Sequence, residues 1–299
     1  MTFVDETVRV SVPATSANLG PGFDCLGLAL SLRDELSVRV VDGPSSITVT
    51  GEGADEVPLD DSHLVVRAMH TAFEAMGLEP PRVELACRNA IPHARGLGSS
   101  SAAIVGGLAL ARGLVAGGGL LLDDEAVFRL AADLEGHPDN VAPAFYGGFV
   151  ISGREGEEWF AVRSGVDPRV STVVFVPDTP LATSVARRLL PASVSHDDAA
   201  ANAGRTALLV AALAGQPEHL LAATRDFVHQ HYREPAMPHT LGLVRSLRDD
   251  GIPAVVSGAG PTVLAFCDGS RGEQALRDRA PDGWGAWHLA VERDGVRVG

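Results

Sequence analysis

The sequence predicts an α+β fold in two halves. Patterns typical of strands and of helices are mixed along the chain, without the strict strand–helix alternation of a parallel α/β fold. The chain has 299 residues, which is enough for one large domain or two ordinary ones. A break near 166–168 separates the halves, so we expect an N-terminal domain at 1–165 and a C-terminal domain at 166–299.

Both element types are indicated in the N-terminal half. Strands are predicted at 8–12, 36–41, 47–50, 83–87, 149–151 and 160–162. A helix is predicted from an N-cap at Ser62 to Met76, because apolar side chains recur there at helical spacing. A second helix follows a glycine-rich segment and ends near Val115, and a third runs from an N-cap at Asp123 to about Leu134.

The C-terminal half contains more helical patterns than strands. Strands are predicted at 172–176, at 255 and at 263–266, the last two around a turn at 257–261. Helices are predicted at 184–190, 197–214, 218–227, 238–250 and near 272–279. Both halves therefore contain both element types, which favours the mixed class.

Composition excludes several classes of function. The net charge is −14, so sequence-independent binding of nucleic acid, which needs a basic surface, is not expected. All 24 basic residues are arginine, and this excludes a Walker-type loop because that loop needs a lysine at the phosphates. The 3 cysteines are far apart and form no CxxC pair, so we interpret them as reduced core thiols.

We expect a cytoplasmic protein without a membrane partner. Residues 1–8 are acidic and lack the apolar core of a secretory signal. Residues 102–122 are almost wholly apolar, but Arg112 and several glycines interrupt them. We therefore interpret this segment as a buried helix rather than a membrane span.

The most informative stretch is the glycine- and serine-rich segment at 92–103. Two glycines flank a leucine, three hydroxyls follow, and a helix of small residues then begins. Glycine allows positive φ and a close approach of the backbone to a ligand. Successive N–H groups at a helix N-terminus then favour an anion such as phosphate.

Two further clusters place polar side chains among turn residues. At 13–24, Asn18 offers an amide and Asp24 a carboxylate, although the stretch also fits an ordinary structural loop. At 135–143, Glu135 offers the carboxylate that Mg²⁺ takes beside a hydroxyl and phosphate oxygens. The alternative for this second cluster is a solvated helix end followed by a plain turn.

Arginines in the second half form the last cluster. Arg187, Arg188 and Arg233 are candidates to bind a carboxylate through the guanidinium fork, and the alternative for each is solvation at the surface. The spacing of the nearby histidines fits no standard zinc site: these are His229, His231 and His239.

Together these segments resemble the GHMP kinases, and most closely the members that phosphorylate homoserine. The family's first, central and third motifs correspond to 13–24, 92–103 and 257–262. The marks that are more specific for the homoserine-phosphorylating members are the segments 15–20, 22–24 and 137–143, with Thr183, Arg187 and Arg233 as further matches. The likeness covers nearly the whole chain.

The resemblance implies a two-domain fold, with a left-handed βαβ unit and the phosphate loop in the N-terminal domain and a ferredoxin-like C-terminal domain. It implies ATP and Mg²⁺ as cofactors and L-homoserine as the small-molecule substrate, and it is compatible with a homodimer. The residues implied to bind the ATP phosphates are Pro92, His93, Ala94, Arg95, Gly96, Leu97, Gly98, Ser99, Ser100, Ser101 and Ala102.

The resemblance also implies roles for individual side chains. Ser100 and Glu135 would hold Mg²⁺, and Asp24 and Asn140 would be the catalytic residues. The residues implied to surround homoserine are Asn18, Asp24, His137 and Asn140 at its amino and hydroxyl ends, and Thr183, Arg187 and Arg233 at its carboxylate.

The chain departs from the family pattern at three places. The interval from Glu135 to His137 is shorter than in some relatives, so Asp133 is the alternative metal carboxylate. Ser101 stands where alanine is common. The stretch 61–65 replaces one that often contains asparagine, which leaves the contacts to the base open.

The mechanism and the function each keep an alternative. Without lysine, the lysine–aspartate pair of some relatives is excluded, so Asp24 either accepts a proton or binds the substrate ammonium. We favour the second role, with Asn140 orienting the hydroxyl. The competing functions are a mevalonate-type kinase, whose substrate has no ammonium for Asp24, and a non-catalytic sensor, in which the metal and phosphate residues should have decayed.

Overall fold

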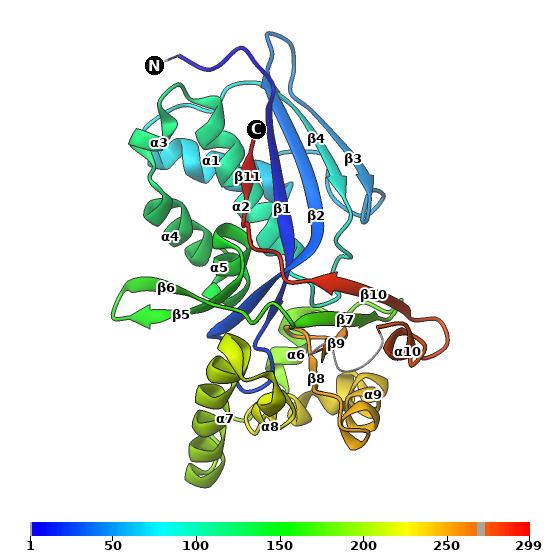
Figure 1. Ribbon diagram of the computed structural model, residues 1–299. Coiled ribbons are helices and arrows are strands. Elements are labelled where there is room, and N and C mark those ends of the chain that lie inside the picture. The colour runs from blue at the N-terminus through cyan, green and yellow to red at the C-terminus, as the bar shows by residue number, and fades with distance from the viewer. Residues whose placement is uncertain (1, 268–272) are drawn as a thin grey trace.

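The computed structural model describes residues 2–267 and 273–299, and it contains two β-sheets with helices packed against them (Figure 1). The larger sheet has the strand order β11-β1-β2-β4-β3, and the β5–β6 hairpin joins it through β2. The smaller sheet has the order β10-β7-β9-β8. The predicted α+β class is confirmed.

The bounds of these elements are as follows. The strands are β1 (Val8–Ala17), β2 (Leu26–Val40), β3 (Ser46–Gly51), β4 (Val83–Asn89), β5 (Phe149–Glu155), β6 (Glu158–Ser164), β7 (Ser171–Val176), β8 (Ala254–Val256), β9 (Val263–Cys267), β10 (Gly285–Ala290) and β11 (Arg297–Val298). The α-helices are α1 (Leu64–Ala75), α2 (Ser99–Leu114), α3 (Gly118–Leu121), α4 (Asp124–Glu135), α5 (Pro138–Tyr146), α6 (Thr183–Arg188), α7 (His196–Gly215), α8 (Leu220–Ala223), α9 (Pro238–Asp249) and α10 (Glu273–Arg277). Two short 3₁₀ helices are η1 (Pro217–His219) and η2 (His231–Ala236).

The long strand β2 connects three neighbours in the larger sheet. It pairs with β1 along most of its length, with a register shift after Pro13, and with β5 and β4 at its two ends. The sequence predicts only 36–41 of this strand. The residues from Leu26 to Leu30 form a continuous buried run, and such a run lacks the alternation that marks a half-exposed strand.

A βαβ unit of the kind that the resemblance implies is formed by β3, α1 and β4. The two strands pair in parallel, with Ser46 opposite Glu84, and α1 connects them. Helix α1 packs against α2, which also lies against β1, so the helix that follows the glycine-rich segment is part of the main core. The left-handed sense of the crossover stays a prediction.

The end of the chain returns to the larger sheet. Strand β11 pairs with β1, with Val298 opposite Val10, although β10 belongs to the smaller sheet (Figure 1). The predicted boundary between residues 165 and 166 falls between β6 and β7, which lie in different sheets. This boundary stays a prediction, because β11 comes after it in the sequence but pairs with β1 in the larger sheet.

The predicted N-cap of the first helix is wrong. The cap of α1 is His63, whose Nδ1 accepts a hydrogen bond from the N–H of Val65 at 3.3 Å. Ser62 lies directly before this cap, and its hydroxyl donates to Asp60 at 2.5 Å. The N-cap predicted at Asp123 is confirmed, since its carboxylate accepts from the N–H of Ala126.

The helix predicted at 218–227 is shorter than expected. Only η1 and α8 form, and α8 ends at Ala223. Beyond it, the Asp226 carboxylate accepts hydrogen bonds from the N–H groups of Val228, His229 and Gln230, which redirects the chain into a turn.

Several elements escaped prediction, among them the short elements α3, η2 and β11. Helix α5 begins at Pro138, a position at which the missing N–H of proline is harmless, but the local sequence resembles a turn and Pro143 resembles a helix breaker. Strand β10 was also missed. The last predicted helix is observed as α10, and its start near 272 lies outside the described residues.

The apolar segment at 102–122 is divided between α2, which ends at Leu114, and α3. Within 2–267 and 273–299, no helix is long and apolar enough to cross a bilayer. Cys25 and Cys87 are free thiols, as predicted, and burial raises their pKa to about 11 and about 12.

Asp34 holds the chain where β4 leads into the glycine-rich segment. Its Oδ1 accepts hydrogen bonds from the N–H groups of Ala90 at 2.7 Å and Ile91 at 2.9 Å. The residue is only 4% exposed. Burial raises the pKa of its carboxyl to about 6, although the two N–H groups act in the opposite direction.

We expect Asp34→Asn to remove a pH dependence from the stability of the protein. The amide oxygen can still accept both N–H groups, whereas the buried charge is lost. Because the folded state binds a proton more tightly than the unfolded chain, the unchanged protein gains about 1 kcal/mol of unfolding free energy, relative to the variant, between about pH 7 and pH 5. Urea unfolding of both proteins across this range measures the gain, and a difference that does not vary with pH would contradict it.

Candidate active site

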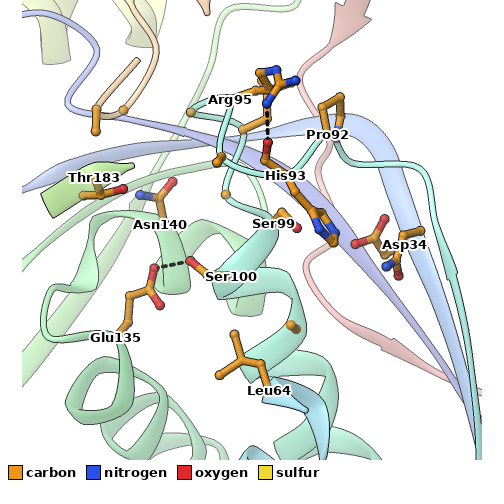
Figure 2. Close-up of a pocket in the computed structure, with 18 of the residues that line it drawn as sticks. Asp34, Leu64, Pro92, His93, Arg95, Ser99, Ser100, Glu135, Asn140 and Thr183 are labelled. Carbon is orange, nitrogen blue, oxygen red and sulfur yellow. Dashed lines mark hydrogen bonds between the residues drawn. The ribbon is translucent and has the colours of Figure 1, made fainter. Parts of the chain in front are cut away.

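A cavity of about 420 Å³ opens where the two halves of the chain meet. Its lining includes the glycine-rich segment at 92–98 and the start of α2, residues 57–58 and 62–65 around the start of α1, the junction of α4 with α5, α6 and η2, and the turn at 258–259. Figure 2 shows side chains that line this cavity, with Asn140, Thr183 and Glu135 on one side of the start of α2.

The conformation of the glycine-rich segment requires its glycines. Gly96 and Gly98 have φ of 78° and 73°, in the left-handed region that glycine tolerates best. A Cβ built at Gly98 would lie 1.9 Å from the Thr15 hydroxyl, and one built at Gly96 would lie 2.3 Å from the Ser257 carbonyl oxygen. Close approach of the backbone to two other segments therefore explains both residues.

The turn at 257–260 joins that segment to the first strand. The Ser257 hydroxyl lies 2.6 Å from the Gly96 carbonyl oxygen and 2.8 Å from the Ser16 hydroxyl. Because a hydroxyl carries one hydrogen, Ser257 donates to the carbonyl and accepts from Ser16. The N–H of Gly258 also donates to the carbonyl of Ala17 at 3.1 Å.

Arg95 fastens the segment to the smaller sheet. Its guanidinium donates to the backbone carbonyls of His93 and Pro177, each at 2.9 Å, and to that of Asp178. The guanidinium of Arg95 is therefore occupied by backbone carbonyls, two of which directly follow β7.

Ser100 and Glu135 line the cavity side by side and are hydrogen-bonded to each other (Figure 2). The hydroxyls of Ser100 and Ser101 donate to the same Glu135 oxygen, at 2.6 Å and 3.0 Å. The alternative carboxylate, Asp133, accepts from the indole of Trp159 at 2.7 Å and does not line the cavity. The geometry therefore favours Glu135 over Asp133 as the carboxylate near the glycine-rich segment.

Asp24 and Arg187 form an ion pair, although they are far apart in the sequence. Two guanidinium nitrogens donate to the two carboxylate oxygens at 2.6 Å and 3.0 Å, and each side chain is about 35% exposed. The hydrogen bond to Asp24, offset in part by burial, raises the pKa of Arg187. The two groups expected at opposite ends of a ligand are thus paired with each other.

Asn18 holds the loop that carries Asp24. Its amide oxygen accepts from the N–H of Asp24 and its amide nitrogen donates to the Gly258 carbonyl, both at 2.9 Å. Asn18 has φ of 66°, a conformation that asparagine adopts more readily than most residues. These contacts anchor the loop to the turn at 257–260.

Arg233 lines the same cavity but is buried, with an exposure of 1%. Its Nη1 donates to the Gly258 carbonyl and to the His229 ring, each at 3.1 Å, and its guanidinium lies 5.7 Å from the centre of the Phe23 ring. Burial, and next the charge of Arg187, lower the pKa of Arg233 to about 10, so it remains a cation at neutral pH.

The remaining predicted residues line the cavity from α5 and α6. The Nδ1 of His137 lies 2.8 Å from the Asp139 carboxylate. Burial lowers the pKa of His137, but this hydrogen bond and the nearby negative charges outweigh it and raise the pKa overall. Asn140 accepts from the Thr15 hydroxyl at 2.8 Å, and Thr183 begins α6.

The cavity gathers most of the predicted site residues, from both halves of the chain. Asp24 does not line the cavity itself but is hydrogen-bonded to Arg187, which does. Ser101 and Ala102 are buried in α2 and do not line the cavity. Sequence reasoning missed the parts played by Thr15 and His229. Thr15 lies within a motif already singled out, but its contacts depend on the fold.

We expect Gly98→Ala to weaken the binding of MgATP by at least about tenfold. The new methyl group would collide with Thr15, and positive φ is unfavourable for alanine by roughly 1–2 kcal/mol. Gly77→Ala is the matched control, because Gly77 also has positive φ, of 69°, but open space around it. Calorimetric titration measures both affinities, and equal affinities would contradict the role of the segment.

Comparisons with known proteins identify the family of the chain. Residues 63–148 match the model of the GHMP kinase N-terminal domain, and residues 207–281 match that of the C-terminal domain. The homoserine kinases of Streptomyces avermitilis and Streptomyces coelicolor are each 53% identical over 97% of this chain, which covers 95% and 94% of those proteins. The crystal structure of homoserine kinase from Cytophaga hutchinsonii matches 100% of this chain and 99% of its own, with a TM-score of 0.83 and 25% identity. The chain belongs to the GHMP kinase family, in its homoserine kinase branch.

Proposed function

We propose that this protein transfers the γ-phosphoryl group of ATP to the side-chain hydroxyl of L-homoserine, giving the O-phospho-L-homoserine of threonine biosynthesis. This activity is supported by the relatives named homoserine kinase, which are 53% identical to this chain over 97% of its length. The observation that carries it is the combination, on one cavity, of the glycine-rich segment with the Asp24–Arg187 pair. The first suits a phosphate, and the second suits a zwitterion.

The nucleotide phosphates bind along the glycine-rich segment and the first turn of α2. Gly98 caps this helix without a side-chain hydrogen bond, so the N–H groups of the first turn are left for an anion. In the absence of lysine, these backbone groups replace the positive charge that a Walker-type loop draws from its side chain.

Ser100 and Glu135 fit the requirements of Mg²⁺. This ion commonly takes one or two carboxylates together with substrate phosphates and water, and the site offers one carboxylate and one hydroxyl. Within the described residues no group of three or more His, Cys, Asp or Glu side chains could hold a metal. When bound, Mg²⁺ would neutralise charge on the transferring phosphoryl group.

The acceptor binds on the other side of the cavity. Homoserine carries an ammonium and a carboxylate, so it can replace each partner of the Asp24–Arg187 pair with a new one of the right sign. Asp24 then holds the ammonium, with Asn18 fixing its loop, while Arg187, Arg233 and Thr183 hold the carboxylate.

The hydroxyl of the acceptor is oriented rather than strongly activated. Asn140 is fixed by the Thr15 hydroxyl and His137 by Asp139, and both line the cavity near α2. Phosphoryl transfer passes through a loose transition state, so positioning and charge neutralisation supply most of the rate enhancement. A dedicated strong base is therefore not required, and Asp24 binds substrate.

The identity of the acceptor can be tested directly. Release of ADP is measured with homoserine, mevalonate, galactose and shikimate at equal concentration. We expect turnover with homoserine alone, because mevalonate has no ammonium for Asp24 and the other two have no charged pair. Comparable turnover with mevalonate, or none with homoserine, would contradict the proposal.

We expect Glu135→Gln to lower kcat by roughly 100-fold or more, with partial recovery at high Mg²⁺. The variant keeps its shape but loses the anionic ligand, and such a contact is worth several kcal/mol in the transition state. Asp133→Asn is the matched control on the same helix, since Asp133 bonds to Trp159 outside the cavity. A damaging Asp133→Asn with a silent Glu135→Gln would show that the carboxylate was misassigned.

A further inference from the structure

His229 is completely buried beside Arg233, between the loop at 18–24 and the start of η2. Its Nε2 lies 2.6 Å from the Gly20 carbonyl oxygen and 3.5 Å from the Asp226 carboxylate. Its Nδ1 lies 3.1 Å from Nη1 of Arg233. The ring also packs against Phe23, with 5.2 Å between the ring centres.

The partners of His229 determine its tautomer. A carbonyl oxygen can only accept, so Nε2 carries the hydrogen. A guanidinium can only donate, so Nδ1 is the bare, accepting nitrogen. Burial, together with the charge of Arg233, lowers the pKa of His229 to about 4, although Asp226 acts in the opposite direction. The ring is therefore a neutral acceptor at neutral pH.

Arg233 is held only by neutral groups. Its Nη1 donates to the imidazole and to the Gly258 carbonyl, and no carboxylate of the described residues forms an ion pair with it. Its Nε is buried without a hydrogen-bond partner among those residues. Arg187 differs, because Asp24 neutralises it. The carboxylates of Asp24, Asp226 and Asp139 stabilise its charge only from beyond ion-pair distance. A buried cation without a direct ion-pair partner is unfavourable, so Arg233 is poised to receive an anion.

We propose that His229 is a positioning residue, which holds the Arg233 guanidinium toward the substrate carboxylate without neutralising its charge. This inference rests on the proposed function, in which Arg233 binds that carboxylate. A carboxylate in place of His229 would also fix the guanidinium, but it would compete with the substrate for the positive charge. A neutral imidazole locked at both nitrogens fixes the direction of Arg233 and leaves its charge for the ligand.

The test compares His229→Phe with His229→Gln. Phenylalanine keeps the packing against Phe23 but leaves Nη1 of Arg233 without its acceptor. Glutamine can accept from Arg233 and donate to Gly20, so it should restore much of the function. Gln230→Met is the control, because it removes a buried hydrogen bond to Val256 from the same segment, whereas the contact of Gln230 with Arg233 is made by its backbone carbonyl and is kept.

We expect His229→Phe to raise KM for homoserine by roughly tenfold or more, with KM for ATP and kcat little changed. His229→Gln should recover most of this loss, and Gln230→Met should leave both KM values unchanged even where it lowers Tm. Should the phenylalanine variant fail to fold, His229→Asn replaces it with the same expectation, because its amide is too short to reach both partners.

Three results would overturn the inference. These are an unchanged KM for homoserine, an equal rise in both KM values, and a change in Gln230→Met of the same size as in His229→Phe. Arg233→Gln separates this failure from failure of the proposed function. If Arg233→Gln raises KM for homoserine and His229→Phe does not, only the inference fails. If neither variant changes it, the role of Arg233 in binding the carboxylate fails as well.

Discussion

The turn at 257–260 bonds to both segments that form the site, and the position of the cavity depends on these contacts. Ser257 reaches the Gly96 carbonyl and the Ser16 hydroxyl, and the Gly258 carbonyl accepts from Asn18 and Arg233. One turn of the second half therefore sets the spacing between the phosphate loop and the acceptor-binding groups. Gly96 has no side chain because one there would collide with this turn.

Charge is distributed unevenly at this junction. The chain carries a net charge of −14, yet two guanidiniums meet at one side of the cavity. Each guanidinium lies over the Phe23 ring, at 5.5 Å from the ring centre for Arg187 and 5.7 Å for Arg233. Arg187 is partly exposed and paired with Asp24, whereas Arg233 is buried and held by neutral partners. The first can exchange its partner for a ligand, and the second forms no direct ion pair among the described residues, so a ligand carboxylate can supply one.

Local patterns in the sequence were enough for some of this site and not for the rest. The glycine-rich segment and the cap at Asp123 each depend on residues that are close together in the sequence, so the sequence predicts them directly. The pairing of Asp24 with Arg187 joins residues 163 positions apart, and no local pattern encodes it. The sequence suggests no role for His229 beyond that of a zinc ligand, which its spacing does not fit, because its contacts depend on where Arg233 and Gly20 lie in the fold. The sequence does not predict helix α5, because its own first residues are typical of a turn and only the packing of the fold makes them helical.

The claim that the Asp24–Arg187 pair opens to receive both charges of one ligand can be tested by binding alone. Calorimetry compares L-homoserine with 3-aminopropan-1-ol, which lacks the carboxylate, and with 4-hydroxybutanoate, which lacks the ammonium. Each analogue satisfies one partner and leaves the other charge unpaired, so each should bind at least about 30-fold more weakly than homoserine. Binding of 4-hydroxybutanoate as tight as that of homoserine would contradict the role of Asp24, and equally tight binding of 3-aminopropan-1-ol would contradict that of the arginines.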